Sequence, residues 1–185
     1  RTGRGVKVVV RPADRRDARD IARIRVETWR AAYAGLISDD ILASLDAERE
    51  GGRREELWEQ FHSDPRTAEL IAHVDGELAG WAALGPSRDE DLAADGQVFA
   101  IYALPSHWGY GVGHALLEAG EEFLRRAGFA QAHLWVLEGN DRAATFYERH
   151  GWIEDGATLL DDSLVRGDAP LAERRRVKLL GLAPT

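Results

Sequence analysis

Apolar and polar positions along the chain follow two periods, one typical of strands and one typical of helices. Short apolar or β-branched runs predict strands at residues 6–11, 70–74, 78–83, 98–104, 133–137 and 174–180. Apolar residues at helical spacing predict helices over 14–35, 115–128 and 141–150, and a less regular helical region over 39–61 that Gly51-Gly52 interrupts. Asp75-Gly76 predicts a hairpin, and residues 85–96 an acidic loop. This order of elements indicates a mixed α/β domain with one sheet.

The segment from Ile101 to Leu117 is the most informative, because three glycines alternate where it passes from strand to helix. They are Gly109, Gly111 and Gly113. Glycine has no side chain, so successive backbone N–H groups can close around an anion, and the helix N-terminus adds about half a positive charge. The turn therefore predicts a phosphate site whose donors are backbone amides. The structural alternative is a turn that only lets the strand enter the helix tightly.

A dinucleotide-binding motif competes for the same turn. Such a fold expects G-x-G-x-x-G after a strand and an acidic residue about 20 residues on, at the end of the next strand. Gly109, Gly111 and Glu138 fit this pattern, but His114 stands where the third glycine is needed. A nicotinamide-dependent oxidoreductase therefore stays an alternative. A P-loop is excluded, because the chain contains no Gly-Lys-Ser or Gly-Lys-Thr.

The glycine turn also resembles a signature of the GNAT superfamily of acetyl-CoA-dependent N-acetyltransferases, which is Gln/Arg-x-x-Gly-x-Gly/Ala at a strand-to-helix turn. The matching segment here is Trp108-Gly109-Tyr110-Gly111-Val112-Gly113, which agrees at both small positions and departs from the signature at Trp108. A second segment, from Asn140 to Trp152, is similar to the family's Asn-x-x-Ala-x-x-Phe-Tyr-x-x-x-Gly-Phe. The resemblance covers roughly Val8 to Lys178.

The resemblance implies an architecture and a coenzyme site. The fold would be a single mixed, mostly antiparallel central sheet, with helices on both faces and a splayed strand pair that holds acetyl-CoA. We expect one such domain over residues 6–180, with residues 1–5 as a flexible N-terminus or a remnant of trimming or tagging. The resemblance assigns these residues to the coenzyme: Ile101, Tyr102, Ala103, Trp108, Gly109, Tyr110, Gly111, Val112, Gly113, His114 and Asn140. At Trp108 it implies altered pyrophosphate contacts rather than loss of binding.

The implied activity is the transfer of an acetyl group from acetyl-CoA to a primary amine by direct attack. That reaction needs a neutral amine, donors for the oxyanion and a proton for the departing thiolate. The resemblance places Tyr147 near the sulfur, where its phenol, with an ordinary pKa of about 10, would be the general acid. It places the backbone of Ile101 and Ala103 beside the pantetheine arm, and Trp29 and Tyr33 in the wall of the acceptor pocket. Core packing is the structural alternative for Tyr147 and for both acceptor residues.

The sequence leaves the general base open. Many relatives carry a Glu near the start of the central strand, and the matching residue here is Gln97, whose carboxamide cannot take a proton. The candidates nearby are His107, His114, Glu27 and the acidic loop Asp89-Glu90-Asp91, each of which is also a typical surface group. A chain of water molecules would serve as well. The missing Glu keeps a second class of function open, a catalytically silent acyl-CoA-binding module or sensor.

The amino-acid composition excludes several classes of binding partner and site. The 185 residues carry 24 Lys and Arg against 32 Asp and Glu, a net charge of −8, which argues against a duplex nucleic-acid binder. The absence of Cys excludes disulfides, a thiolate nucleophile and Cys-ligated metal sites. No apolar run approaches the ~20 residues that span a bilayer, and the first residues lack the apolar core of a secretory signal. We expect a cytoplasmic protein acting on a small-molecule or peptide amine, without metal, nucleic acid or membrane, and with a homodimer left open.

Overall fold

The computed structural model describes residues 5–166 and 169–181, and its central feature is a seven-stranded sheet in the order β1-β2-β3-β4-β5-β7-β6. The strands are β1 (Val8–Pro12), β2 (Ala68–Val74), β3 (Glu77–Pro86), β4 (Gly96–Ala103), β5 (Gln131–Leu137), β6 (Ile153–Arg166) and β7 (Ala169–Leu179). The α-helices are α1 (Ala18–Ala32), α2 (Asp39–Ser44), α3 (Ala47–Glu56), α4 (Trp58–Phe61), α5 (Val112–Arg126) and α6 (Asp141–Arg149). None of the described helices has the length and apolar character that crossing a bilayer requires.

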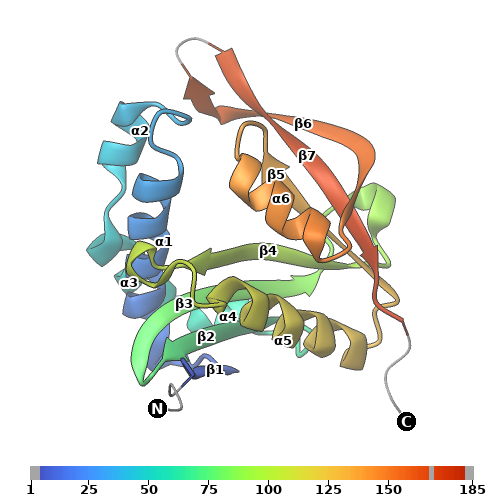
Figure 1. Ribbon diagram of the computed structural model, residues 1–185, viewed down its shortest axis with the longest axis horizontal. Helices are drawn as coiled ribbons and strands as arrows, with labels where there is room; N and C mark the ends of the chain where they lie inside the picture. The colour runs from blue at the N-terminus through green and yellow to red at the C-terminus, as the bar shows by residue number, and fades with distance from the viewer. Residues whose placement is uncertain (1–4, 167–168, 182–185) are drawn as a thin grey trace.

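Helices cover both faces of the β1–β4 part of the sheet (Figure 1). On one face, α5 buries Leu116 and Leu124 in a core with Leu70 of β2. On the other face, α1 buries Ile24 in a core with Ile71 of the same strand. Neighbouring residues of a strand point to opposite faces, so Leu70 and Ile71 each anchor one layer. Full burial of such a side chain contributes about 1.5–3 kcal/mol to stability. The predicted fold class is confirmed.

The sheet opens between β4 and β5. These neighbouring strands run parallel but pair only at Gly96↔Ala132 and Gln97↔His133. Gly96 permits the close packing at this end, because a Cβ there would lie 3.0 Å from the side chain of Leu124. Beyond this point the strands diverge, and Figure 1 shows β5, β6 and β7 turned away from β1–β4. The splayed strand pair is confirmed, and its inner edges carry backbone N–H and C=O groups that need other partners.

The strand directions exclude the dinucleotide alternative. Every ladder other than β4–β5 is antiparallel among the described strands. A doubly wound dinucleotide-binding fold requires a mostly parallel sheet. The predicted hairpin is confirmed, with Asp75 and Gly76 joining β2 and β3 at φ values of 48° and 86°.

The predicted interruption at Gly51-Gly52 is wrong, because α3 continues through both residues. Gly51 is buried against α1, and a Cβ at this position would lie only 3.1 Å from the Cα of Arg19. The missing side chain therefore permits two helices to approach each other closely. Glycine costs a helix about 1 kcal/mol relative to alanine, which this packing offsets.

The strand β6 is absent from the predicted elements, and β7 begins at Ala169 rather than at residue 174. β6 lies at the edge of the sheet, and two shifts of register interrupt its pairing with β7. The apolar side chains described in its first part are largely in solvent, with Ile153 68% and Leu160 62% exposed. Because neither face of this part of the strand is buried, apolar and polar residues do not alternate along its sequence, and that alternation is the pattern from which a strand is predicted.

Candidate active site

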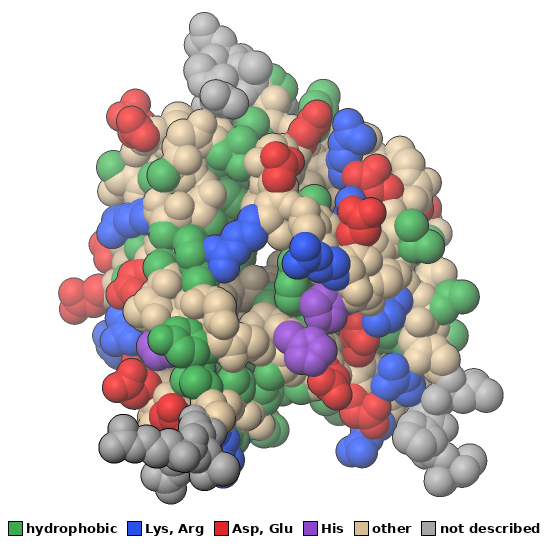
Figure 2. Space-filling model, in the orientation of Figure 1, with side chains coloured by type: hydrophobic (Ala, Val, Ile, Leu, Met, Phe, Trp, Pro, Cys, Tyr) green, Lys and Arg blue, Asp and Glu red, His purple; other side chains and the backbone are tan. Residues whose placement is uncertain are grey.

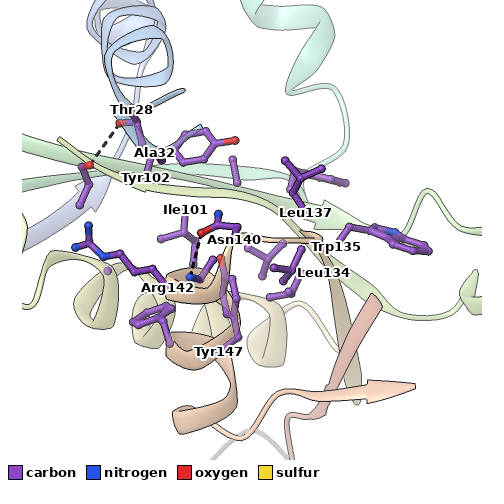
Figure 3. A pocket seen from close by; sticks show the side chains of 18 of the residues that line it. Thr28, Ala32, Ile101, Tyr102, Leu134, Trp135, Leu137, Asn140, Arg142 and Tyr147 are labelled. Carbon is purple, nitrogen blue, oxygen red and sulfur yellow. Dashed lines mark hydrogen bonds between the residues drawn. The ribbon is translucent and has the colours of Figure 1, made fainter. Parts of the chain in front are cut away.

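The divergence of β4 and β5 opens a cavity of about 580 Å³ between the two parts of the sheet. In Figure 3, Ile101 lies on one side of the gap and Leu134 and Leu137 on the other, while Tyr147 projects between them from α6. Figure 2 shows the molecule hollowed near the centre of this face, with histidine and basic side chains at the edge of the hollow. The volume lies in the range of small-molecule and cofactor pockets.

The cavity brings together most of the residues that the sequence singled out, although they come from distant segments. Those that line it are Trp29, Tyr33, Ile101, Tyr102, Ala103, Trp108, Gly109, Gly111, Val112, Gly113, His114, Asn140 and Tyr147. Tyr110 is not among the lining residues. It is 48% exposed, and its ring lies beside His107 with centroids 6.1 Å apart.

The glycine turn forms one end of the cavity. Gly109 and Gly111 adopt the left-handed backbone conformation, with φ values of 85° and 81°, which favours glycine. A Cβ at either position would meet nothing within 4 Å, so the missing side chains leave the surface of the turn open. α5 begins at Val112 without a side-chain cap, and Ala115 makes its first backbone hydrogen bond, to Gly111. Among the described residues, the amides of the first turn before Ala115 have no acceptor, and such groups suit an anion.

The backbone of β4 offers hydrogen-bonding groups to the cavity at alternate residues. The N–H of Leu104 donates to the carbonyl of Ala79 in the β3 segment at 2.7 Å, so it points away from the gap. Backbone groups alternate along a strand, so those of Tyr102 also face β3. Those of Ile101 and Ala103 then face the gap between β4 and β5, where β4 has no partner strand.

Trp108 is held from two sides. Its Nε1 donates to the carbonyl of Ala103 at 2.9 Å, and the guanidinium carbon of Arg142 lies 3.8 Å from the centroid of its ring. The hydroxyl of Thr28 donates to the same carbonyl at 3.4 Å. Within the described chain, the backbone groups of this part of β4 without a partner are therefore those of Ile101 and the N–H of Ala103. The cation–π contact keeps Arg142 beside the glycine turn, where it supplies a positive charge that the indole does not have.

Asn140 caps α6 and also faces the cavity. Its Oδ1 accepts a hydrogen bond from the backbone N–H of Ala143 at 3.3 Å, which satisfies one of the unpaired amides at the helix start. The side-chain NH2 group keeps its two donors for another partner. One residue thus fixes the start of the helix and presents donors to the gap.

Tyr147 stands two turns further along α6. Its ring packs edge-on against Phe146 and Trp152, with centroid distances of 5.2 Å and 6.3 Å. In the described part of the chain its hydroxyl makes no hydrogen bond, and the side chain lines the cavity. Burial raises the pKa of Tyr147 above that of an ordinary phenol, so the hydroxyl stays protonated at neutral pH.

An aromatic cluster forms the opposite end of the cavity. The Nε1 of Trp29 donates to the hydroxyl of Tyr102 at 3.0 Å, and the rings of Trp29 and Tyr33 meet edge-on at 5.1 Å. Burial raises the pKa of both Tyr33 and Tyr102, so both phenols stay neutral. This end offers apolar rings and neutral hydroxyls to a ligand.

Most of the candidate bases are occupied or remote. Gln97 is buried, and its Oε1 accepts a hydrogen bond at 2.8 Å from the backbone N–H of Arg88, in the loop that precedes β4. Glu27 is exposed and lies outside the cavity. The carboxylates of Asp89 and Asp91 bind Arg175 at 3.0 Å and 2.7 Å, and this partner lowers the pKa of Asp91. These two acids fasten the loop to β7.

The histidine candidates remain at the cavity wall. The Nε2 of His107 lies 3.4 Å from a carboxylate oxygen of Glu77, and its Nδ1 shares a hydrogen bond with the hydroxyl of Ser106. The Nδ1 of His114 lies 2.8 Å from the Nε2 of His150, which places two imidazoles at the edge of the glycine turn. Nowhere in the described ranges do three or more histidine or acidic side chains gather as a metal site would need.

Glu173 of β7 lines the cavity and is missing from the residues that the sequence singled out. It pairs across the sheet with Leu137, the last residue of β5. Burial, followed by the negative charge of Asp161, raises the pKa of Glu173 above that of an ordinary carboxyl group. In the sequence it is the acidic residue that follows Leu171-Ala172 and precedes the arginine run, a departure from pattern that could have marked it.

Comparisons with known proteins agree with this geometry. The model of the acetyltransferase (GNAT) family matches residues 27–152. The uncharacterized N-acetyltransferase YuaI of Bacillus subtilis (strain 168) is 35% identical over 144 residues, which cover 77% of this chain and 79% of that protein.

Two solved structures share the fold at low sequence identity. The PaiA N-acetyltransferase of Thermoplasma acidophilum, in complex with coenzyme A, is 21% identical with a TM-score of 0.66, covering 90% of this chain and 98% of that one. YncA of Salmonella typhimurium, solved with acetyl-CoA, is 20% identical with a TM-score of 0.66 and covers 94% of both chains.

Proposed function

The chain belongs to the GNAT family of acetyltransferases, and from this premise we propose that it transfers an acetyl group from acetyl-CoA to a primary amine. One observation carries the proposal: the splayed strands β4 and β5 enclose a cavity that ends at a glycine turn with free amides. Proteins of the same fold have been solved with coenzyme A or acetyl-CoA, which supports the same ligand for this cavity.

The residues present fit an acyl-CoA thioester. The amides of the glycine turn would hold the pyrophosphate, and Arg142 would add the positive charge that Trp108 lacks. The backbone of Ile101 and the NH2 group of Asn140 would bind the amides of the pantetheine arm, which need both donors and acceptors. The N–H of Ala103, which also faces the gap, would polarise the thioester carbonyl.

The reaction is a direct attack. The amine nitrogen forms a bond to the thioester carbon, and the carbonyl oxygen becomes an oxyanion that the β4 backbone stabilises. The carbon–sulfur bond then breaks, its electron pair goes to sulfur, and Tyr147 gives its proton to the thiolate. The proton that the nitrogen loses as the amide forms returns the phenolate of Tyr147 to a phenol. The hydroxyl of Tyr147 has no competing partner among the described residues, so it is available for this role.

The raised pKa of Tyr147 is compatible with a general acid. Burial holds the phenol in its protonated form, which an acid must have before the reaction. The same dry surroundings disfavour a thiolate and raise the pKa of the departing thiol above its ordinary value of about 8.5. Burial therefore raises the pKa of the phenol and the pKa of the thiol together. For this reason burial alone does not make the proton transfer from Tyr147 to sulfur less favourable.

The test begins with binding and continues to turnover. Coenzyme A is titrated by calorimetry, and then acetyl-CoA is mixed with a panel of alkyl, aryl and peptide amines while free thiol and product mass are followed. We expect binding together with release of one thiol for each acetylated amine. Failure of coenzyme A to bind would refute the proposed site. Binding with no turnover on any amine would instead indicate an acyl-CoA-binding module.

A further inference from the structure

Resting on the proposed acetyl transfer, we propose that Glu173 is a catalytic residue that binds the ammonium group of the acceptor and takes its proton. The acceptor is then an amine that reaches the cavity as a cation. This assigns the general base to β7, on the far side of the cavity from the β4 position where the sequence carries Gln97.

The position of Glu173 follows from the register of β5, β7 and β6. Glu173 stands opposite Leu137 of β5 and opposite Leu159 of β6. Residues directly opposite each other in a ladder share a face of the sheet, so Glu173 lies on the same face as Leu137. Both side chains line the cavity, as does Tyr147, which comes from α6. Acid and base would therefore approach the reacting atoms from different elements.

Among the described residues, no counter-ion lies within ion-pair distance of the carboxylate of Glu173. In the described parts of the chain it makes no hydrogen bond and no ion pair. The adjacent Arg174 points to the other face of β7, where its guanidinium lies 3.5 Å from Glu138 and 3.7 Å from Glu154. A half-buried carboxylate without a partner is costly, and a bound cation removes that cost.

A cation lies at the aromatic end of the cavity: the guanidinium carbon of Arg25 is 4.5 Å from the centroid of the Trp29 ring, and Arg25 forms an ion pair with Glu50 at 3.1 Å. The groups that interact electrostatically with Glu173 itself are acidic or neutral. They are Asp161 of β6, which has a partner of its own, and the phenols of Tyr33 and Tyr102. Glu173 contributes to the raised pKa of both phenols, which places its charge near the aromatic end of the cavity. This end therefore combines the negative charge of Glu173 with aromatic rings, of which that of Trp29 already has the Glu50-paired guanidinium of Arg25 over it. Such surroundings suit an ammonium group attached to an alkyl or aryl chain.

The proton balance is complete. The carboxylate of Glu173 takes one proton from the ammonium and passes it to solvent, which leaves a neutral amine with a lone pair. That nitrogen forms the new bond to carbon, the carbon–sulfur bond breaks, and sulfur receives the proton of Tyr147. The second proton of the nitrogen returns the phenolate of Tyr147 to a phenol. One ammonium and one acetyl thioester thus give one amide, one thiol and one released proton.

The experiment compares the wild type with Glu173→Gln, which keeps the size of the side chain and removes its charge. Glu173→Asp serves as the rescue variant, and Glu138→Gln is the matched control, because Glu138 is exposed at the end of β5 outside the cavity. Each protein is titrated with coenzyme A, and then, with coenzyme A bound, with n-hexylamine and with the uncharged n-hexanol. The profile of kcat/KM against pH is measured with the best amine of the panel.

We expect Glu173→Gln to bind coenzyme A normally, to bind n-hexylamine at least tenfold more weakly and to bind n-hexanol unchanged. At neutral pH its kcat/KM falls about 10²–10⁴-fold. In the wild type, kcat/KM rises as Glu173 ionises and then becomes level. In Glu173→Gln it rises about tenfold per pH unit toward the pKa of the amine, because only the neutral amine reacts. Glu173→Asp keeps the level region at a lower rate, and Glu138→Gln resembles the wild type.

Two outcomes would overturn the assignment. If the wild type acetylates amines and Glu173→Gln keeps the same pH profile and rate, Glu173 is not the base although the proposed function stands. If the wild type binds coenzyme A but acetylates no amine, the proposed function fails. Equal binding of n-hexylamine by the wild type and Glu173→Gln then refutes the ammonium site as well.

Discussion

Replacing Tyr147 with Phe removes one hydroxyl group and keeps the aromatic ring. The edge-on contacts of the ring with Phe146 and Trp152 do not involve that hydroxyl, and no described residue accepts or donates a hydrogen bond to it. No buried partner is left unsatisfied, so we expect the free energy of unfolding to change by less than about 0.5 kcal/mol. The affinity for coenzyme A should also stay near that of the wild type.

The effect on the reaction should be much larger than the effect on stability. General acid catalysis contributes about 10²–10⁴-fold, and each factor of ten corresponds to about 1.36 kcal/mol in the activation free energy. Loss of the acid should therefore raise the barrier by about 2.7–5.4 kcal/mol. Because burial raises the pKa of Tyr147, the wild-type enzyme should lose no activity through ionisation of this phenol up to about pH 9.

The assay is a single-turnover measurement of thiol release with saturating acetyl-CoA and a confirmed amine. It is repeated with an acetyl-CoA analogue whose thiol is more acidic, because a better leaving group needs less help from an acid. The defect of Tyr147→Phe should shrink with that analogue. An unchanged rate constant in Tyr147→Phe, or a defect of the same size with both thioesters, would contradict the role of acid and leave Tyr147 as a packing residue.

Three further changes test the glycine turn, the departure from the motif at Trp108 and the fully buried His133 of β5. Gly111→Val places a β-branched residue at a φ of 81°, which costs about 1–3 kcal/mol, and calorimetry should show that the folded variant no longer binds coenzyme A; wild-type affinity would refute the cradle. Trp108→Arg should bind coenzyme A as tightly as the wild type or more tightly, and complete loss of binding would mean that the indole matters more than the amides. Burial lowers the pKa of His133 in the folded protein below its value in the unfolded chain. As the pH falls, the imidazole is therefore protonated in the unfolded chain before it is protonated in the folded protein, which favours unfolding. Urea unfolding should therefore show stability that is present above about pH 6.5 and lost as the pH falls below it, with a smaller loss in His133→Leu.

Local patterns were enough to predict the glycine turn and the hairpin. In both, the residues that cause the structure lie within a few positions of one another. Gly109 and Gly111 occupy left-handed backbone positions, as an alternating glycine turn requires, and Asp75-Gly76 closes β2 on β3. The strand before the turn and the helix after it show their own periods, so the conformation of the turn could be expected before any tertiary contact was known.

The roles of several other residues depend on distant parts of the chain and cannot be recognised from their neighbours in the sequence. Gly51 looks like a helix breaker, but it lies inside α3 because α1 packs against it at Arg19. The sequence resemblance places the backbone of Ala103 beside the pantetheine arm, but its carbonyl already accepts a hydrogen bond from the indole of Trp108. The carboxylates of the loop 89–91 looked like candidate bases, but Asp89 and Asp91 are bound to Arg175 from a distant strand.

The sequence by itself determined the order of most elements, the class of fold and the glycine turn, because these depend on short-range periodicity and on the backbone freedom of glycine. The tertiary structure decided how far β4 and β5 pair, which side chains meet in the gap, and that Glu173 faces the same cavity as Tyr147. The physical reason is the register of strands that lie far apart in the chain. Register is set by the packing of whole faces, and a shift of one residue would turn Glu173 to the opposite face of the sheet.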